Sequence, residues 1–470
     1  MDLISVRNDT ICAVATPVGE GGIGIVRVSG PDALPILRKL FSPLPREGAV
    51  QSHRLYHGWI VDPESGERVD EVLVCWMAGP KTYTREDVVE IDSHSGYGIL
   101  DRLLRLVLSA GARLAHPGEF TRRAFMNGRI DLSQAEAVIE LIRSRSEESL
   151  RHAGRQLGGG LRRLVELWRE KLLACQARLE AFIDFPEDLD ELESSEAAGV
   201  IERLRTDVLL PMEELRNRYV EGRVLREGLT LVLAGKPNVG KSSLLNGLVG
   251  RERAIVTAYP GTTRDVIEDS FILNGVAVRV LDTAGLRPLG DAIEALGMAK
   301  TRESLAAADV VLWMLDLSRP LDESDDEVYA SLADRRVFLL LNKADLPACF
   351  TLDDVKRRYP STASTPSVVL SVLRPADVEL LRSRLKAAFL DRPLEASASG
   401  GVIPNLRHKE CLDRAVEHLV RALALFEGGR WSELVSCELG EAGRALEHIL
   451  GIYRDEALLD RIFGDFCVGK

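Results

Sequence analysis

The chain contains 470 residues, and at roughly 150 residues per domain this length suggests about three domains. Hydrophobic residues make up 46% and charged residues 28%, which is typical of folded proteins and excludes a mainly disordered chain. No uncharged apolar run approaches the roughly 20 residues that span a bilayer, and the first residues lack the pattern of a signal peptide. We therefore expect a cytoplasmic protein without a membrane span.

Four segments of different pattern predict the domain organisation. Residues 1–121 mix short β-rich runs with turns, which predicts an α+β domain. Residues 122–226 carry apolar residues at three- and four-residue spacing, which predicts helices. Residues 227–392 alternate apolar strand runs with helical segments, which predicts an α/β domain with a mostly parallel sheet. Because residues 393–470 return to a helical pattern, this α/β domain is inserted into one interrupted helical domain.

The charge distribution leaves two interpretations of the first helical segment. The formal net charge is −12, but residues 122–178 contain twelve Lys and Arg against seven Asp and Glu. These side chains form either solvated helix faces or a basic strip that contacts an RNA backbone. A whole-molecule attraction to nucleic acid is excluded, so any such binding needs a local patch.

A phosphate-binding loop begins the predicted α/β domain. Residues 235–242 fit the pattern GxxxxGK[ST], follow an apolar strand and precede a helix. In such a loop the main-chain N–H groups surround the phosphates, while Lys241 supplies a charge to the β and γ oxygens and Ser242 a hydroxyl to Mg²⁺. The predicted nucleotide contacts here are Asn238, Val239, Gly240, Lys241, Ser242 and Ser243.

Two further motifs at strand ends identify the nucleotide as GTP. The motif Asp282, Thr283, Ala284 and Gly285 predicts a carboxylate beside Mg²⁺ and a glycine amide near the γ-phosphate. The motif at 342–345 contains Asn342, Lys343 and Asp345, and its carboxylate can accept from the two N–H donors that guanine has and adenine lacks. A last loop, with Ser371, Val372 and Leu373, is expected to contact the base through its main chain.

The sequence leaves alternatives for the residues that would catalyse GTP hydrolysis. Leu286 stands where Ras-type enzymes place a glutamine, and a leucine cannot orient water. Asn238 could instead help to hold a monovalent cation between the phosphates, or it could cap the loop. Glu294 is the best carboxylate for a base that acts through water, or it is a surface helix residue. A Thr of 261–265 is expected to bind Mg²⁺ from a mobile switch loop.

Several motifs in order along the chain resemble the MnmE (TrmE) family of tRNA modification GTPases. They are residues 21–30, 83–90, 117–125, 127–132 and 466–470, so the resemblance covers nearly the whole length. It implies an N-terminal α+β tetrahydrofolate-binding and dimerisation domain, a discontinuous all-α helical domain and an inserted Ras-like P-loop GTPase domain.

The resemblance also implies roles for particular residues. The positions that match the contacts of a 5-formyl-tetrahydrofolate or related folate are Arg27, Glu86, Arg129 and Lys470. Those that match the potassium ligands are Asn238, Thr257, Tyr259 and Thr262, and those that match the magnesium ligands are Ser242 and Thr263. The implied switch contacts with GTP are Thr257, Ala258, Tyr259, Pro260, Gly261, Thr262 and Thr263. Glu294 matches the general base, and Cys467 matches a cysteine needed for tRNA modification, as nucleophile or proton donor.

Two positions depart from the family pattern. Arg85 stands where a glycine is usual, and Ser95 also replaces a glycine. An arginine in place of glycine can reshape the turn that carries it, so we expect the departure to affect the folate site more than the GTP site.

The function implied is that of a potassium-activated GTPase and homodimer. With an FAD- and NADH-dependent MnmG (GidA) partner it would add an aminomethyl or carboxymethylaminomethyl group to C5 of the wobble uridine of tRNA. One alternative is an Era-like switch in ribosome assembly, but that class carries a KH-type RNA module and no GXXG loop occurs here in such a setting. Another is a folate-binding regulator, which would leave the GTP motifs unused.

Overall fold

The structure is a computed structural model that describes residues 9–43, 50–184, 199–250, 268–282, 306, 308–333, 335–391, 401–427, 433–453 and 455–470. The chain divides into two compact units. The first unit comprises Met1–Ile139, Leu157–Glu170 and Gly443–Lys470, and the second comprises Glu140–Gln156 and Lys171–Ala442.

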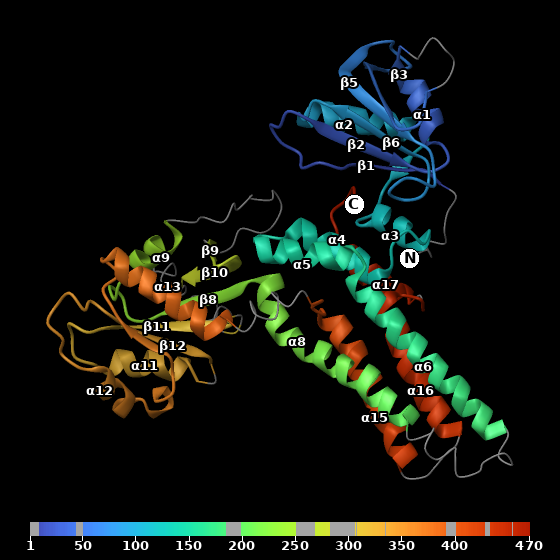
Figure 1. Ribbon diagram of the computed structural model, residues 1–470. Coiled ribbons are helices and arrows are strands. Elements are labelled where there is room, and N and C mark those ends of the chain that lie inside the picture. Colours follow the sequence, from blue (N-terminus) through green and yellow to red (C-terminus); the bar gives the residue numbers. More distant parts are fainter. Residues whose placement is uncertain are drawn as a thin grey trace. The chain divides into compact units, whose positions relative to one another are not determined.

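The first unit is built on a seven-stranded sheet with the order β3-β4-β5-β6-β2-β1-β7 (Figure 1). The strands are β1 (Ile11–Val14), β2 (Gly24–Ser29), β3 (Phe41–Ser42), β4 (Arg54–Val61), β5 (Arg68–Met77), β6 (Val88–Ser93) and β7 (Arg113–Leu114). Helices α1 (Ala33–Leu40) and α2 (Tyr97–Ser109) cover one face through a continuous apolar core. The other face leaves Leu55 and Leu73 exposed.

Segments from the end of the chain pack against the beginning of the chain in this unit. Helix α3 (Glu119–Met126) shares an apolar cluster with α17 (Glu456–Gly464). The ring centroids of Phe125 and Phe463 lie 6.4 Å apart. Asp455 begins α17 by accepting from the N–H groups of Ala457 and Leu458, a capping arrangement that fixes where the helix starts.

The second unit contains a six-stranded sheet with the order β13-β12-β11-β8-β10-β9. Its strands are β8 (Leu229–Ala234), β9 (Glu268–Leu273), β10 (Val276–Asp282), β11 (Val310–Asp316), β12 (Val337–Asn342) and β13 (Ser367–Val369). Every neighbouring pair is parallel except β9 and β10, which form an antiparallel hairpin. The prediction of a mostly parallel sheet is therefore confirmed.

Helices cover both faces of this sheet (Figure 1). Helices α9 (Lys241–Val249) and α13 (Pro375–Phe389) pack on one face, and α11 (Glu323–Ser331) and α12 (Leu352–Arg358) pack on the other, where the short helix η4 (Pro360–Thr362) follows α12. Because both faces are buried, β11 is buried along its whole length, which explains its continuous apolar sequence.

The remaining helices come from both sides of the α/β region. They are α4 (Leu132–Arg143), α5 (Glu147–Leu157), α6 (Gly160–Asp184), the π-helix η2 (Arg205–Leu209), α8 (Leu210–Glu227), α15 (Leu406–Glu427) and α16 (Glu433–Leu450). In the second unit α8 packs on α15, and Gln176 of α6 donates to Ser436 of α16 at 3.0 Å. Helices from before and after the α/β region thus form one discontinuous helical domain, as predicted.

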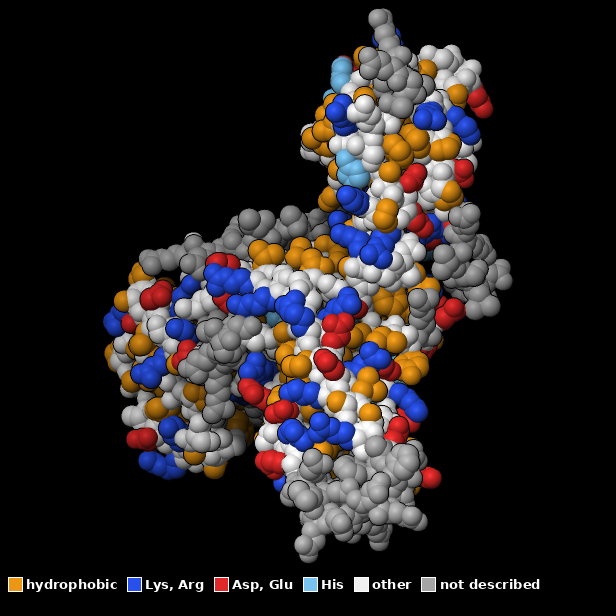
Figure 2. Space-filling view, turned by 45° about the vertical axis from the view of Figure 1, so that its right-hand side comes forward, with side chains coloured by type: hydrophobic (Ala, Val, Ile, Leu, Met, Phe, Trp, Pro, Cys, Tyr) orange, Lys and Arg blue, Asp and Glu red, His pale blue; other side chains and the backbone are white. Residues whose placement is uncertain are grey.

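The surface does not separate the two interpretations of the basic helical segment. Basic and acidic side chains are interspersed over much of the helical region (Figure 2). Arg151 pairs with Glu147 and Glu148, and Arg162 pairs with Glu166. Within the described ranges, the helices include none long and apolar enough to cross a membrane.

Candidate functional sites

The phosphate-binding loop joins β8 to α9 in a conformation that only special residues adopt easily. Asn238 has φ 63° and Gly240 has φ 109°, both in the left-handed region. A Cβ on Gly240 would collide with the side-chain amide of Asn342. Helix α9 begins at Lys241, so its free N–H groups point at the loop, the arrangement that binds phosphate.

Lys241 lies folded over this loop. Its Nζ donates to the carbonyl of Gly235 at 2.6 Å and to that of Lys236 at 2.9 Å. Ser242 and Ser243 follow in the first turn of α9. The lysine and the first hydroxyl therefore both belong to the first turn of the helix that follows the loop, where the motif requires them.

Asn342, at the end of β12, connects three loops. Its Nδ2 donates to the carbonyl of Val239 at 2.7 Å, and its Oδ1 accepts from the N–H of Val372 at 3.0 Å. The side chain is buried, so both hydrogen bonds replace contacts with water. The phosphate loop, the loop after β12 and the loop after β13 are thus held together at the carboxyl edge of the sheet.

The predicted base-reading residues gather at this edge. Lys343 has φ 66° and its Nζ donates to Asp316 at 2.6 Å. A hydrogen bond from Ser371 lowers the pKa of Asp345, so this exposed carboxyl stays ionised as an acceptor. The side chain of Leu373 is 74% exposed, which leaves its main chain as the part that can contact a base.

Some predicted residues lie outside the described part of the chain. They are Thr257, Ala258, Tyr259, Pro260, Gly261, Thr262, Thr263, Thr283, Ala284, Gly285 and Glu294. The main chain of Asp282 ends β10 beside Leu233 of β8, which brings its backbone to the same edge as the phosphate loop. Three predicted roles therefore stay predictions: the contacts of the switch residues with GTP, the potassium ligands that lie among these residues, and the general base Glu294.

Lys236 is a residue of the phosphate loop whose role the motif does not indicate. Its Nζ lies 2.8 Å from the buried carboxylate of Asp325 and 2.9 Å from Asp322. These two acids form the capping box that begins α11. The loop is thereby anchored to a helix more than eighty residues away in the sequence, a contact that no local pattern signals.

A second site lies in the first unit, where the end of the chain meets β2. The Nε of Arg27 donates to Glu90 at 2.8 Å, and its Nη1 donates to the carbonyl of Gly469 at 3.1 Å. Gly469 has φ 98°, and a Cβ there would collide with the carbonyl of Val14. Only glycine allows this close approach.

The predicted residues Cys467 and Lys470 are brought to Arg27 by this contact. The carbonyl of Cys467 accepts from the N–H of Gly118 at 3.4 Å, and its side chain is exposed. Burial lowers the pKa of Lys470, and the nearby charge of Arg27 lowers it further. A thiol and two cations therefore share one site.

Arg129 reaches the same region from the turn after α3. Its guanidinium lies 4.8 Å from the ring centroid of Tyr83, and its Nη1 donates to the carbonyl of Tyr83 at 3.2 Å. Burial raises the pKa of Tyr83, while Arg129 and Arg27 both act to lower it. The charges of both predicted arginines thus act on the phenol of Tyr83. No pattern in the sequence indicated that Tyr83 interacts with these residues in this way.

Glu86 belongs to a neighbouring network. Both its carboxylate oxygens lie 3.2 Å from Nη1 of Arg123, and Oε2 also accepts from Ser29 at 2.7 Å. Arg123 in turn donates to Asp9 at 2.6 Å and to Glu119 at 3.0 Å. The structure therefore brings Lys470 near Arg27 and relates Arg129 to Arg27 through Tyr83. Glu86 contacts Arg123 and Ser29 instead, residues that the sequence pattern did not single out.

Arg113 and Glu119 complete this network. Nη1 and Nη2 of Arg113 donate to the two oxygens of Glu119 at 2.8 and 2.5 Å, a bidentate pair. Burial would raise the pKa of Glu119, but the hydrogen bonds from Arg113 and the N–H of His116, with the charge of Arg123, outweigh it and lower the pKa to about 2.

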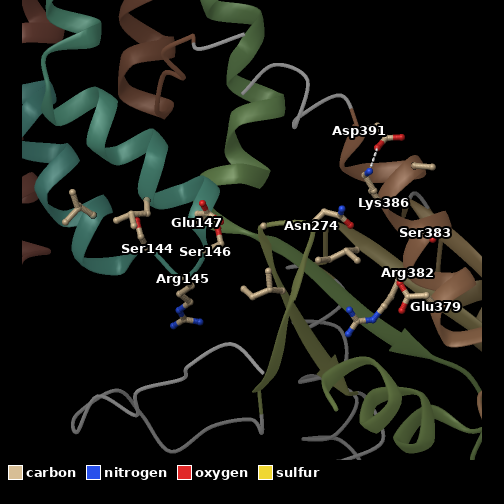
Figure 3. A pocket seen from close by; sticks show the side chains of 16 residues that line it. Ser144, Arg145, Ser146, Glu147, Asn274, Glu379, Arg382, Ser383, Lys386 and Asp391 are labelled. Atoms are coloured by element: carbon tan, nitrogen blue, oxygen red, sulfur yellow. Dashed lines mark ion pairs between the residues drawn. The ribbon is translucent and has the colours of Figure 1, made fainter. Parts of the chain in front are cut away.

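A cavity of about 1280 Å³ lies in the second unit, away from its phosphate loop (Figure 3). It is lined by the tip of the β9–β10 hairpin, by α13 and by the turn between α4 and α5, with Arg145, Glu147 and Lys386 among its charged residues. The hairpin tip, Asn274 and Gly275, precedes β10, so the cavity is at the opposite edge of the sheet from the phosphate loop.

The fold and the loops at the carboxyl edge of the sheet define the α/β part of the second unit as a P-loop GTP-binding domain. Residues 132–467 match the family described as the MnmE helical domain, and residues 10–129 match the GTP-binding protein TrmE N-terminus. The chain belongs to the MnmE family of tRNA modification GTPases and is a GTP hydrolase.

Curated relatives align over nearly the whole chain. The tRNA modification GTPase MnmE of Syntrophobacter fumaroxidans is 55% identical over 98% of this chain and 98% of its own. That of Carboxydothermus hydrogenoformans is 45% identical over 98% of this chain and 99% of its own. Among solved structures, Aquifex aeolicus Era is 26% identical, with 40% of this chain and 66% of that chain covered and a TM-score of 0.27.

Replacing Asp345 with asparagine should change the preferred nucleotide. The NH₂ group of asparagine would face one of guanine's N–H groups, and two donors cannot form a hydrogen bond with each other. We therefore expect GTP affinity to fall about 100-fold or more. Affinity for xanthosine triphosphate, which offers a carbonyl at that edge, should rise. Titration of both nucleotides tests this, with Asp353→Asn on α12 as the control. Unchanged GTP affinity would exclude Asp345 as the base-reading residue.

Glu119 should contribute stability that depends on pH. Its pKa in the folded chain, about 2, lies below the usual 4.5, so its stabilisation is fully present above about pH 4.5 and is lost as the pH falls toward 2. Glu119→Gln should weaken protection of β1 from hydrogen exchange at pH 7 and flatten its dependence on pH between 4.5 and 3. The control is Glu71→Gln, an exposed residue on β5. Equal exchange in wild type and Glu119→Gln would contradict this assignment.

Proposed function

We propose that this protein couples potassium-activated GTP hydrolysis to modification of C5 of the wobble uridine in tRNA, with a folate as one-carbon donor. The observation that carries the proposal is the contact of Arg27 with the carbonyl of Gly469 at 3.1 Å. This contact brings an exposed cysteine and a lysine from the end of the chain to the N-terminal sheet, in a chain that also carries a complete guanine-reading edge.

In the proposed GTP site Lys241 neutralises the phosphates, and Ser242 and Thr263 hold Mg²⁺. Asn238, Thr257, Tyr259 and Thr262 would hold K⁺, which would supply positive charge that stabilises the transition state. Glu294 accepts a proton from the attacking water through a bridging water. The left-handed conformation of Asn238, at the tip of the loop, supports its part.

In the proposed folate site the cations and the carboxylate have separate tasks. Glu86 accepts from the N–H groups of a pterin edge, while Arg27, Arg129 and Lys470 bind the carboxylates of the glutamyl tail. The donor sets fit such a molecule, because the cations lie around Tyr83 and the carboxylate is held in a neighbouring network. Cys467 lies close enough to Lys470 to influence its pKa, which supports a role as nucleophile or proton donor.

The wider proposal concerns assembly. The protein acts in the cytoplasm as a homodimer whose N-terminal domains dimerise, and an MnmG (GidA) partner supplies FAD and NADH chemistry. We keep the division into residues 1–121, 122–226, 227–392 and 393–470 as the proposed domain boundaries. Hydrolysis brings two GTPase domains together, and the helical domain transmits this change to the folate and tRNA site. Family membership favours this function over a ribosome-assembly switch.

Hydrolysis should depend on the monovalent cation. We expect GTP turnover at least about tenfold faster in KCl than in NaCl at equal ionic strength, because the proposed K⁺ would stabilise the charge of the transition state. Asn238→Ala should remove the difference, and Asn246→Ala on α9 serves as the control. Equal rates of the wild type in both salts would exclude the potassium role.

The modification itself is tested by mass spectrometry of wobble nucleosides from a strain that lacks the gene. Wild-type protein should restore the C5-modified uridine, whereas Cys467→Ser and Lys241→Ala should not. Cys467→Ser should retain GTP hydrolysis, because it lies in the first unit, and Cys437→Ser on α16 should restore modification. Full restoration by Cys467→Ser would exclude a chemical role for that thiol.

A further inference from the structure

Two exposed arginines, Arg85 and Arg129, come from two segments that are hydrogen-bonded to one another at the edge of the proposed folate site. Nη1 of Arg85 donates to the carbonyl of Asn127 at 2.9 Å, and Nη1 of Arg129 donates to the carbonyl of Tyr83 at 3.2 Å. The side chain of Asn127 also donates to the carbonyl of Thr84 at 2.7 Å. These three bonds join the loop before β6 to the turn after α3, and each guanidinium group is anchored to the main chain of the other segment.

The main chain of Arg85 is in a conformation that an arginine rarely adopts. Its φ is 63°, in the left-handed region that glycine enters without steric cost. Strained positions of this kind are retained where the side chain has a task. The hydrogen bond to Asn127 fixes the guanidinium of Arg85 but uses only one of its five donors.

The charge of these two arginines is not balanced by nearby acids. Among the described residues, the ion pairs include none from Arg85 or Arg129 to an Asp or Glu, since both donate to carbonyl oxygens. The acids of this site are engaged elsewhere, because Glu86 lies against Arg123 and Glu90 lies against Arg27. The junction of these two segments therefore presents two cations to the solvent and suits a ligand that carries more than one anionic group.

We propose that Arg85, together with Arg129, binds the successive carboxylates of a polyglutamyl folate tail and makes this protein selective for folates with several glutamyl residues. This inference rests on the proposed folate site. Each added γ-glutamyl residue brings one carboxylate, and the planar fork of arginine matches a carboxylate in geometry. Because both side chains are exposed, the tail can extend past them into solvent.

A phosphate backbone of RNA is the less favoured occupant. It would need a longer track of unpaired basic residues, and the neighbouring Arg122 and Arg123 are paired with Asp460 and with Glu86, Asp9 and Glu119. The two exposed arginines are thus bordered by arginines that are already paired with acids.

The test is a calorimetric titration of the full-length protein with 5-formyl-tetrahydrofolate that carries one or three glutamyl residues. For wild type we expect about tenfold tighter binding of the triglutamyl form, decreasing in 0.5 M NaCl as exposed charges are screened. Arg85→Gly should bind the monoglutamyl form within about twofold of wild type but lose most of the tail-length advantage. Glycine suits the left-handed main chain, so this variant should fold and hydrolyse GTP normally.

Two further variants serve as a second test and as a control. Arg85→Asn, which also tolerates this conformation, should behave like Arg85→Gly, and Arg38→Gln, an exposed residue of α1, should keep the full advantage. An advantage that persists in Arg85→Gly, or that is absent in wild type, overturns the inference while leaving the folate site intact. Absence of any folate binding by wild type overturns the folate site itself and the inference with it. Weaker tRNA binding by Arg85→Gly, with the tail advantage unchanged, would assign the arginine to RNA instead.

Discussion

In the first unit, the hydrogen bonds of the Arg27 guanidinium hold the end of the chain against the N-terminal sheet. The guanidinium donates to a carboxylate on β6 with one nitrogen and to the main chain of residue 469 with another, so it joins the sheet to the end of the chain. Hydrogen bonds from a charged donor are among the stronger ones in proteins. Because Gly469 lies against the carbonyl of Val14, the tail has one way to dock, and the positions of Cys467 and Lys470 follow from it.

The corresponding constraint in the second unit is the buried amide of Asn342. It links the loops that follow β8, β12 and β13, which all end at the carboxyl edge of one sheet. Ligands of such sheets bind at this edge. The loops that are predicted to contact the phosphates and the base are therefore held together by the same side chain.

These two sites differ in how much of them the sequence predicts. The phosphate loop and the base-reading motif could be placed because each is a short pattern at the end of an apolar strand, and strand order brings such ends together. The parallel sheet was predictable for the same reason, from runs such as β11 that are apolar throughout. The approach of Lys236 to Asp325 could not be predicted, because it depends on how α11 packs.

In the site of the first unit, fewer of the contacts could be predicted from the sequence. Arg27, Arg129 and Lys470 could be grouped only by resemblance to a family, since contact between residues 442 positions apart has no local signal. Tyr83, Arg123 and Glu119 were missed because their roles come from burial and from one another's charges. The switch residues lie outside the described ranges, so their roles remain predictions from the sequence.

The long separation between Arg27 and Gly469 has a consequence for synthesis of the protein. The N-terminal sheet leaves the ribosome hundreds of residues before α17 is made, and domains generally fold as they emerge. Until then the surface around Val14 and Gly118, which later receives the tail, has no cover. Closing so long a loop costs entropy that grows slowly with its length, so docking of the tail belongs to the last stage of folding, after the inserted domain is complete.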